Sequence, residues 1–113
     1  MIYHMAWRSD WDAGIADGVY RNPSLETEGF IHCTHEPGLL VSVANQFFAE
    51  NRAEDLLIVS IDPKRVAAEI KDEDPGVCIA FPHVYGPIEL DAVLGFDTMR
   101  RVSGGWRLPE RFE

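Results

Sequence analysis

The run Leu56-Leu-Ile-Val-Ser-Ile61 is the stretch of this sequence that decides the fold. It is an almost continuous apolar run of strand length, which is typical of a central strand buried on both faces of a sheet. Upstream of it, apolar residues recur with helical spacing and predict a helix with one buried face. These residues are Leu40, Val43, Ala44, Phe47 and Phe48. The pattern predicts a buried sheet with a helix packed against it.

The rest of the chain adds short elements separated by turns. Ser9, with Asp12 three residues later, predicts the N-cap of a short helix that ends near Asp17. Thr34 or His35 is expected to cap the second helix. Further strands are expected at residues 2–6, 30–33 and 77–81, with loops at 72–76 and 82–89. Residues 90–96 are expected to form a last strand or a passage from helix to strand. Because strands and helices do not alternate strictly, we expect an α+β fold with a split, mainly antiparallel sheet, flanking helices and a single domain over residues 1–113.

Composition and charge restrict the partners of this chain. Its 113 residues carry a formal net charge of −9, which disfavours general binding to nucleic acids or to anionic membranes. A local nucleotide pocket remains compatible with that charge. No signal sequence or membrane-length apolar run is present, and Cys33 and Cys78 both lie in apolar runs. We therefore expect a cytoplasmic protein with two reduced core thiols, and the sequence does not indicate an oligomeric state.

The segment Gly29-Phe-Ile-His-Cys-Thr-His-Glu36 is the first candidate for chemistry. Side chains alternate along a strand, so Ile31 and Cys33 are expected to face the core while His32 faces the opposite side. Thr34 and His35 then lie beside the N-terminus of the next helix, where anions bind favourably. A structural interpretation remains open, in which His32 is a hydrogen-bonded core histidine.

The segment Phe81-Pro-His-Val-Tyr-Gly-Pro-Ile88 is the second candidate. Its two prolines and its glycine predict a rigid loop that presents His83 and Tyr85 on the same side. Histidine exchanges protons near neutral pH, and tyrosine can stack on a planar ring. The alternative is a turn fixed by proline with an aromatic side chain packed on the core. The acidic run Asp72-Glu-Asp74 is most simply interpreted as solvated surface, although Glu69 or Glu73 would supply a carboxylate if it lay near the histidines.

A third histidine, His4, lies on the first predicted strand. Together with His32, His35, His83 and Cys33 it raises the question of a metal site, but the spacing of His32-Cys-Thr-His35 is not typical of zinc ligands. We therefore expect no metal, and we expect Cys33 to be too buried to act as a nucleophile.

The motifs GFIHCT (29–34) and FPHVYGP (81–87), with Tyr3-His4, Ala44–Phe48, Leu57–Asp62 and Leu90–Val93, resemble the DUF952 family of small bacterial and plant proteins. The resemblance extends over residues 2 to 96. That family is in turn distantly similar to the ADP-ribosyltransferase fold, a split sheet with a nicotinamide-nucleotide cleft between its halves.

The resemblance implies roles for individual residues. His4 would hydrogen-bond the adenosine ribose of NAD, and Phe30, His32 and Thr34 would line the nicotinamide pocket. The same cleft would place His35 with the cofactor-binding residues His4, Phe30 and Thr34. His83, His32 and Tyr85 would then be the catalytic residues. The glutamate that normally stabilises the ribosyl cation in that fold has no evident counterpart here, since Glu89 is too far along the chain.

Three functions follow as hypotheses. The first is an enzyme that binds NAD and transfers ADP-ribose, or cleaves the glycosidic bond with water, with an unknown acceptor. The second is a module that binds a nucleotide such as NAD or ADP-ribose without turnover. The third is a metal-dependent hydrolase that uses the histidines.

Overall fold

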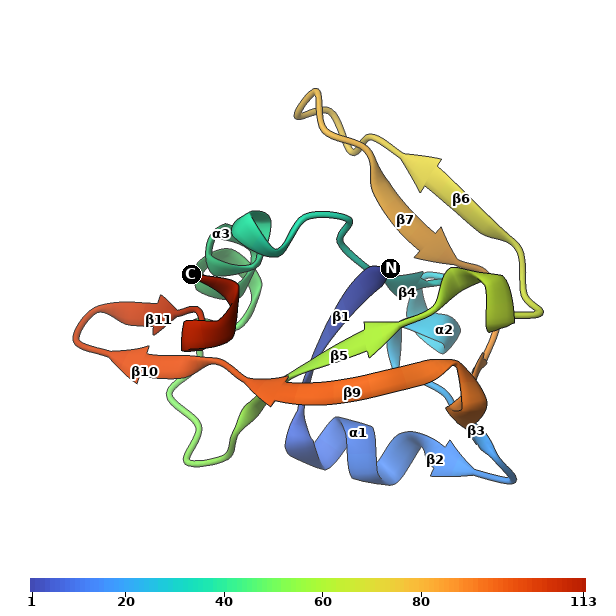
Figure 1. The fold of residues 1–113 in the computed structure, drawn as a ribbon, viewed down its shortest axis with the longest axis horizontal. Coiled ribbons are helices and arrows are strands. Elements are labelled where there is room, and N and C mark those ends of the chain that lie inside the picture. The colour runs from blue at the N-terminus through green and yellow to red at the C-terminus, as the bar shows by residue number, and fades with distance from the viewer.

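The central sheet of the protein is built around the apolar run identified above. In the computed structural model, which describes all 113 residues, strand β5 (Leu56–Ile61) is buried at every position. It pairs antiparallel with β1 (Ile2–Trp7) on one side and with β9 (Val93–Thr98) on the other. Figure 1 shows these three strands crossing the middle of the molecule. The prediction of a central strand buried on both faces is confirmed.

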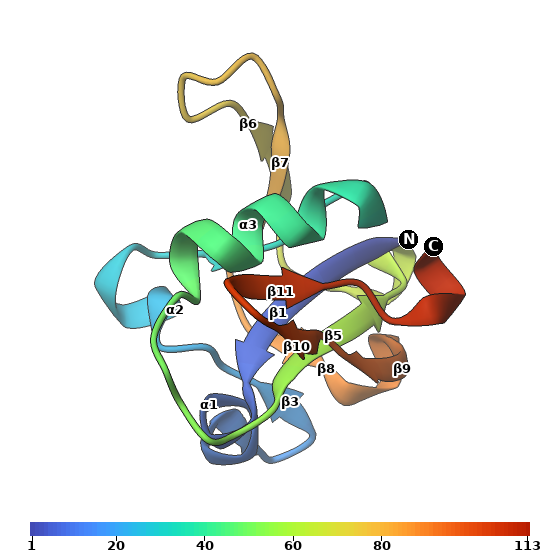
Figure 2. The ribbon, with the colours of Figure 1, turned by 90° about the vertical axis from the view of Figure 1, so that its left-hand side faces the viewer.

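Two hydrophobic clusters lie on the two faces of this sheet, because side chains alternate along β5. Leu57, Val59 and Ile61 belong to one cluster, whereas Leu56 and Ile58 belong to the other. The second cluster is covered by α3 (Leu40–Phe47) and by the hairpin of β10 (Arg100–Val102) and β11 (Gly105–Arg107). Figure 2 shows α3 and this hairpin lying over β1 and β5.

The first cluster is closed by α1 (Arg8–Gly14), α2 (Ser24–Thr27) and two small antiparallel sheets. One contains β2 (Ile15–Ala16), β3 (Val19–Tyr20) and β8 (Ile88–Glu89). The other contains β4 (Ile31–His32), β7 (Phe81–Val84) and β6 (Ile70–Glu73), in that order. Single 3-10 turns occupy Pro37–Leu39, Pro63–Arg65, Leu90–Ala92 and Glu110–Phe112. The expected α+β class with mainly antiparallel strands is therefore confirmed.

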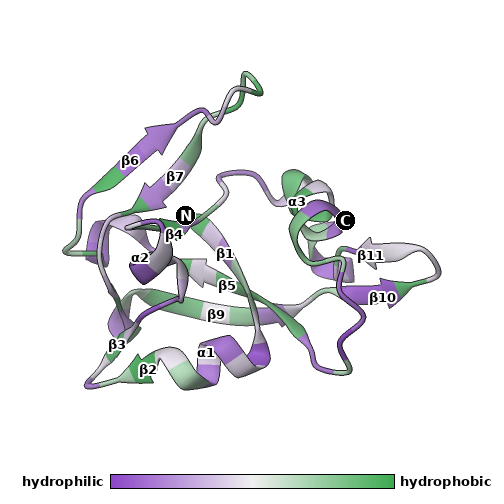
Figure 3. Ribbon diagram, turned by 180° about the vertical axis from the view of Figure 1, so that it is seen from behind, coloured by the Kyte–Doolittle hydropathy of each residue, from purple (hydrophilic) through white to green (hydrophobic).

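The hairpin of β6 and β7 projects from the body of the molecule (Figures 1 and 2). Figure 3 shows hydrophilic residues along β6, in contrast to the hydrophobic residues of α3 and β9. The turn of the hairpin is stabilised by Asp74, whose Oδ1 accepts hydrogen bonds from the backbone N–H groups of Gly76 (2.7 Å) and Val77 (2.8 Å). None of the helices combines the length and the apolar character that crossing a bilayer requires.

The hairpin also corrects two sequence predictions. The strand expected at 77–81 and the loop expected at 82–89 are wrong, because the strand is β7 and begins at Phe81. Pro82, His83 and Val84 in this strand are all buried, whereas Val77 and Ile79 lie in the turn before it and are exposed. Cys78 lies in this exposed turn, so its assignment to the core is wrong, while Cys33 is buried as expected. Neither cysteine forms a disulfide.

The helix caps differ from the predicted ones as well. Ser9 lies inside α1 and donates its backbone N–H and its hydroxyl to the carboxylate of Glu54, at 2.7 and 3.0 Å. Thr34 forms a β-bridge with Tyr3, and a 3-10 turn that begins at Pro37 precedes α3. Contacts with distant parts of the chain, the Glu54 carboxylate for Ser9 and the Tyr3 backbone for Thr34, have replaced the expected side-chain caps.

Gly14 permits the close return of β3 beside the end of α1. A Cβ atom at this position would lie 2.3 Å from the carbonyl oxygen of Arg21 and 3.0 Å from the ring of Tyr20. We expect Gly14→Ala to lower the free energy of unfolding by roughly 2 kcal/mol, as overpacking does elsewhere. Urea denaturation measures this loss. Gly38→Ala is the matched control, because nothing lies within 4 Å of its added Cβ, and an equal loss there would contradict the steric explanation.

Candidate functional site

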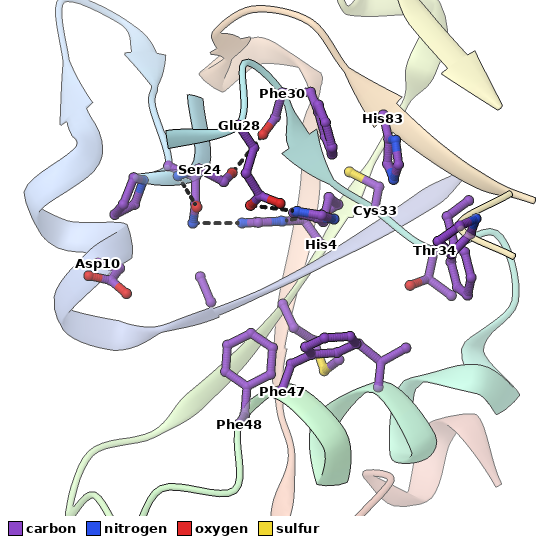
Figure 4. A pocket seen from close by; sticks show the side chains of 18 residues that line it. His4, Asp10, Ser24, Glu28, Phe30, Cys33, Thr34, Phe47, Phe48 and His83 are labelled. Atoms are coloured by element: carbon purple, nitrogen blue, oxygen red, sulfur yellow. Dashed lines mark hydrogen bonds and ion pairs between the residues drawn. The ribbon is translucent and has the colours of Figure 1, made fainter. Parts of the chain in front are cut away.

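A cavity lies where β1, β4 and β7 meet α1, α2 and the C-terminal end of α3. Its volume is about 520 Å³. Figure 4 shows Phe30 and His83 at one side of it and Phe47 and Phe48, from the end of α3, at the opposite side. Cavities of this size accommodate small organic ligands.

Five of the seven residues predicted for the site line this one cavity. They are His4, Phe30, His32, Thr34 and His83. Tyr85 and His35 are not part of its wall. The ring of Tyr85 lies 5.3 Å from that of Phe30 between centroids, and its hydroxyl donates a hydrogen bond to Glu73. His35 is exposed and its Nε2 lies 2.6 Å from the carboxylate of Asp72 on β6.

His4 is buried in the floor of the cavity, and both of its ring nitrogens are hydrogen-bonded. Nδ1 donates to the carbonyl oxygen of His32 at 2.7 Å, because a carbonyl can only accept. Nε2 therefore accepts a hydrogen bond from the hydroxyl of Tyr20 at 2.9 Å, and Asn22 donates to that hydroxyl oxygen at 2.6 Å. Burial lowers the pKa of His4 from 6.5 to about 4, so the ring is neutral at physiological pH. His4 thus ties β1 to β4 and β3.

Phe30 and His83 form an aromatic pair next to this floor. Their ring centroids are 4.1 Å apart and the ring planes differ by 18°, a stacked arrangement. The strand pairing that places His32 opposite His83 produces this contact, and the predicted alternation is confirmed: Ile31 and Cys33 are buried, while His32 is exposed. Burial also raises the pKa of Cys33, which is consistent with an unreactive thiol.

Glu73 completes the arrangement around His83. Its carboxylate accepts a hydrogen bond from Nδ1 of His83 at 2.9 Å and another from the hydroxyl of Tyr85. These two donors, Tyr85 first, lower the pKa of Glu73, and the same contact raises the pKa of Tyr85. His83 is 8% exposed, and Nε2 makes no hydrogen bond within the protein. In the neutral tautomer that donates from Nδ1, Nε2 is an acceptor that has no partner within the protein.

Glu73 is partly exposed, yet it lies against His83, so the alternative in which it supplies a carboxylate beside the histidines fits its position. Asp72 and Glu73 belong to β6, which pairs with β7 in a register that places Glu73 opposite Phe81. The other glutamates considered from the sequence point elsewhere. Glu69 lies 3.8 Å from Lys71, and Glu89 accepts from the backbone of Ala67 at 3.2 Å.

Several residues of the cavity were not found from the sequence. Phe47 and Phe48 were assigned to the buried face of a helix, but Phe47 is 66% exposed and both line the cavity. Glu28, which lies 2.9 Å from Nε2 of His32, and Asp10 add two carboxylates to the wall. An exposed phenylalanine on an otherwise apolar helix face is a pattern that sequence alone does not distinguish from a core residue.

No group of three or more His, Cys, Asp or Glu side chains is arranged to hold a metal ion. Three of the four histidines instead pair one by one with carboxylates: His32 with Glu28, His35 with Asp72 and His83 with Glu73. The structure therefore offers no cluster of ligands that supports the hypothesis of a metal-dependent hydrolase.

Comparison with known proteins supports the fold and identifies a family. The crystal structure of protein CC0527 from Caulobacter crescentus has a TM-score of 0.81 and 23% sequence identity, covering 98% of this chain and 96% of that chain. Its solution NMR structure has a TM-score of 0.69 and 24% identity, covering 93% and 89%. At such identities the likeness establishes the fold alone. No curated protein matches the chain. Residues 5–96 match the family described as "Protein of unknown function (DUF952)", and the chain therefore belongs to that family.

Proposed function

We propose that the cavity binds the nicotinamide–ribose end of NAD or of a related nucleotide, and that His83 acts as a general base in cleaving the N-glycosidic bond. The acceptor of the ribosyl group is water or an unidentified nucleophile. The observation that supports this proposal most directly is the hydrogen bond between Glu73 and Nδ1 of His83, because it leaves Nε2 free beside the cavity.

The walls of the cavity suit a flat ring. Phe30, Phe47, Phe48 and Phe81 all contribute to them, and a planar ligand gains both buried apolar area and stacking energy against such side chains. The proposal takes the split sheet as a distant relative of the ADP-ribosyltransferase fold, in which the nucleotide lies between the halves of the sheet. Here the cavity likewise lies between β1 of the central sheet and the β4–β7–β6 sheet.

The chemical step needs one base. The bond between C1′ of the ribose and the ring nitrogen breaks, and its electron pair stays on nicotinamide, which leaves as a neutral molecule. An oxygen of water forms the new bond to C1′, and its proton passes to Nε2 of His83. The carboxylate of Glu73 then stabilises the resulting imidazolium, as an orienting carboxylate does in other histidine-based sites.

Incubation with NAD tests the proposal. We expect millimolar NAD to raise the melting temperature by several degrees, since a ligand at about 100 times its dissociation constant adds about 2.7 kcal/mol to stability. Chromatography of the incubated mixture should then detect free nicotinamide. Stabilisation without nicotinamide, even on long incubation, would support the binding module instead. The absence of any shift in melting temperature would contradict both functions.

A further inference from the structure

The cavity that we propose as the nucleotide site has an unusual charge distribution. Its wall contains the carboxylates of Asp10 and Glu28 but no lysine and no arginine. Asp10 is half-buried on α1 and makes no ion pair or side-chain hydrogen bond within the protein. Glu28 has His32 as its only ionic partner, at 2.9 Å. The formal net charge of −9 adds a negative field around the whole molecule.

The histidine in the floor does not offset these carboxylates. His4 is neutral at physiological pH, and Nδ1 and Nε2 are both engaged inside the protein. A pyrophosphate group in this cavity would therefore meet two carboxylates and no fixed cation. Phosphate sites in proteins rely instead on arginine, lysine or the N-terminus of a helix.

The same wall is favourable for a positive ring. Figure 4 shows Phe30 on one side and Phe47 and Phe48 on the other, and Phe81 also lines the wall. Aromatic rings attract cations through their negative π-clouds. Figure 4 shows Asp10 at the edge of this aromatic enclosure, on the side of α1. A flat cation in the cavity would be enclosed by a wall with four phenylalanines and would have a carboxylate at the rim.

We propose that the cavity selects a cationic aromatic ring attached to a sugar without phosphate, so that a pyridinium nucleoside is preferred over the dinucleotide NAD. This inference rests on the proposed function only in placing a nicotinamide-type ring in the same cavity. Selectivity comes from Asp10 and Glu28, which attract the ring charge and repel phosphate.

Two matched ligand pairs test this selectivity by NMR titration. The first pair is 1-methylnicotinamide, a cation without a cleavable glycosidic bond, and its neutral dihydro form. We expect the cation to bind at least tenfold more tightly. The second pair is nicotinamide riboside and NAD, and we expect the riboside to bind about tenfold more tightly at low ionic strength, where charge effects are least screened.

Variants that remove the negative charge of Asp10 or Glu28 test whether these residues cause the preference for the cationic ligand. Asp10→Asn is expected to weaken binding of 1-methylnicotinamide about tenfold and to leave the dihydro form unchanged, and Glu28→Gln to act in the same direction. Asp12→Asn, on α1 with Asp10, and Glu26→Gln, on α2 two residues before Glu28, are the controls, since neither Asp12 nor Glu26 lines the cavity. Equal binding of the cation and its dihydro form would overturn the inference, and so would tighter binding of NAD than of the riboside. Cation-selective binding without nicotinamide release would overturn the proposed cleavage and leave the inference intact.

Discussion

Replacing His83 by glutamine is expected to reduce the rate of nicotinamide release roughly 1,000-fold, within the 10²- to 10⁴-fold range of general acid–base catalysis. Glutamine keeps a planar polar group against Phe30 and can still hydrogen-bond to Glu73, but it cannot accept a proton at neutral pH. Steady-state kinetics with NAD, followed by quantification of nicotinamide, measures the loss. Binding should change little, because the substitution leaves the aromatic walls in place.

Substitutions of Glu73 and Tyr85, the residues next to His83 in the hydrogen-bond chain, should reduce the rate of nicotinamide release less than His83→Gln does. Glu73→Gln removes the charge that stabilises the imidazolium, and we expect a smaller loss, roughly tenfold to a hundredfold. Tyr85→Phe removes only one of the two donors to Glu73. The pKa of Glu73 should therefore rise toward its normal range, with little change in the rate of nicotinamide release. Comparison of the two variants distinguishes the effect of the negative charge on Glu73 from the effect of the hydrogen bond by which Tyr85 positions it.

The control for His83→Gln is the same substitution at His35, a histidine that also pairs with a carboxylate but lies outside the cavity. We expect His35→Gln to retain the wild-type rate. A loss of activity in His35→Gln comparable with that of His83→Gln would contradict the assignment of the base, and it would favour the cofactor-binding role that the sequence implied for His35. Full activity of His83→Gln would exclude His83 as the base.

Patterns that depend on local periodicity could be predicted from the sequence. The run Leu56–Ile61 is apolar at five of its six positions, and a run of this length is typical of a strand buried on both faces. The alternation around His32 likewise followed from the two-residue period of a strand. Five of the predicted site residues therefore converge on one cavity.

Features that depend on pairing between distant segments could not be predicted in this way. Glu73 and His83 are ten residues apart, and only the hairpin register brings the carboxylate to the imidazole. Asp10 and Phe47 belong to helices that meet the cavity from different sides, so nothing in their local sequence marks them as neighbours. Pro82 misled the prediction in another way. Two prolines and a glycine within seven residues predict a loop that begins at Pro82, yet this proline lies in β7, the middle strand of its sheet, where proline is rare.

Stability should fall as the pH decreases from about 6.5 to about 4, and His4 is expected to contribute about 3 kcal/mol of this loss. Burial lowers the pKa of His4 in the folded protein to about 4, whereas the unfolded chain binds a proton near pH 6.5. The unfolded state therefore holds more protons between these values, which means that stability rises with pH across this range. The contribution is present in full above pH 6.5. The neutral ring matters because only this form can accept from Tyr20 while donating to the carbonyl of His32.

Protonation of carboxylates with lowered pKa values, Glu73 among them, also lowers the stability of the protein at the acidic end of this range. The pH dependence of wild-type stability alone therefore does not isolate the contribution of His4. Urea denaturation of the wild type and of His4→Gln at pH 7 and at pH 4.5 makes the separation. Glutamine can donate and accept without titrating, hence the advantage of the wild type over the variant should shrink by about 2 to 3 kcal/mol between the two pH values. An advantage that stays constant would mean that His4 titrates equally in both states, and the neutral hydrogen-bonded ring that ties β1 to β3 and β4 would then be contradicted.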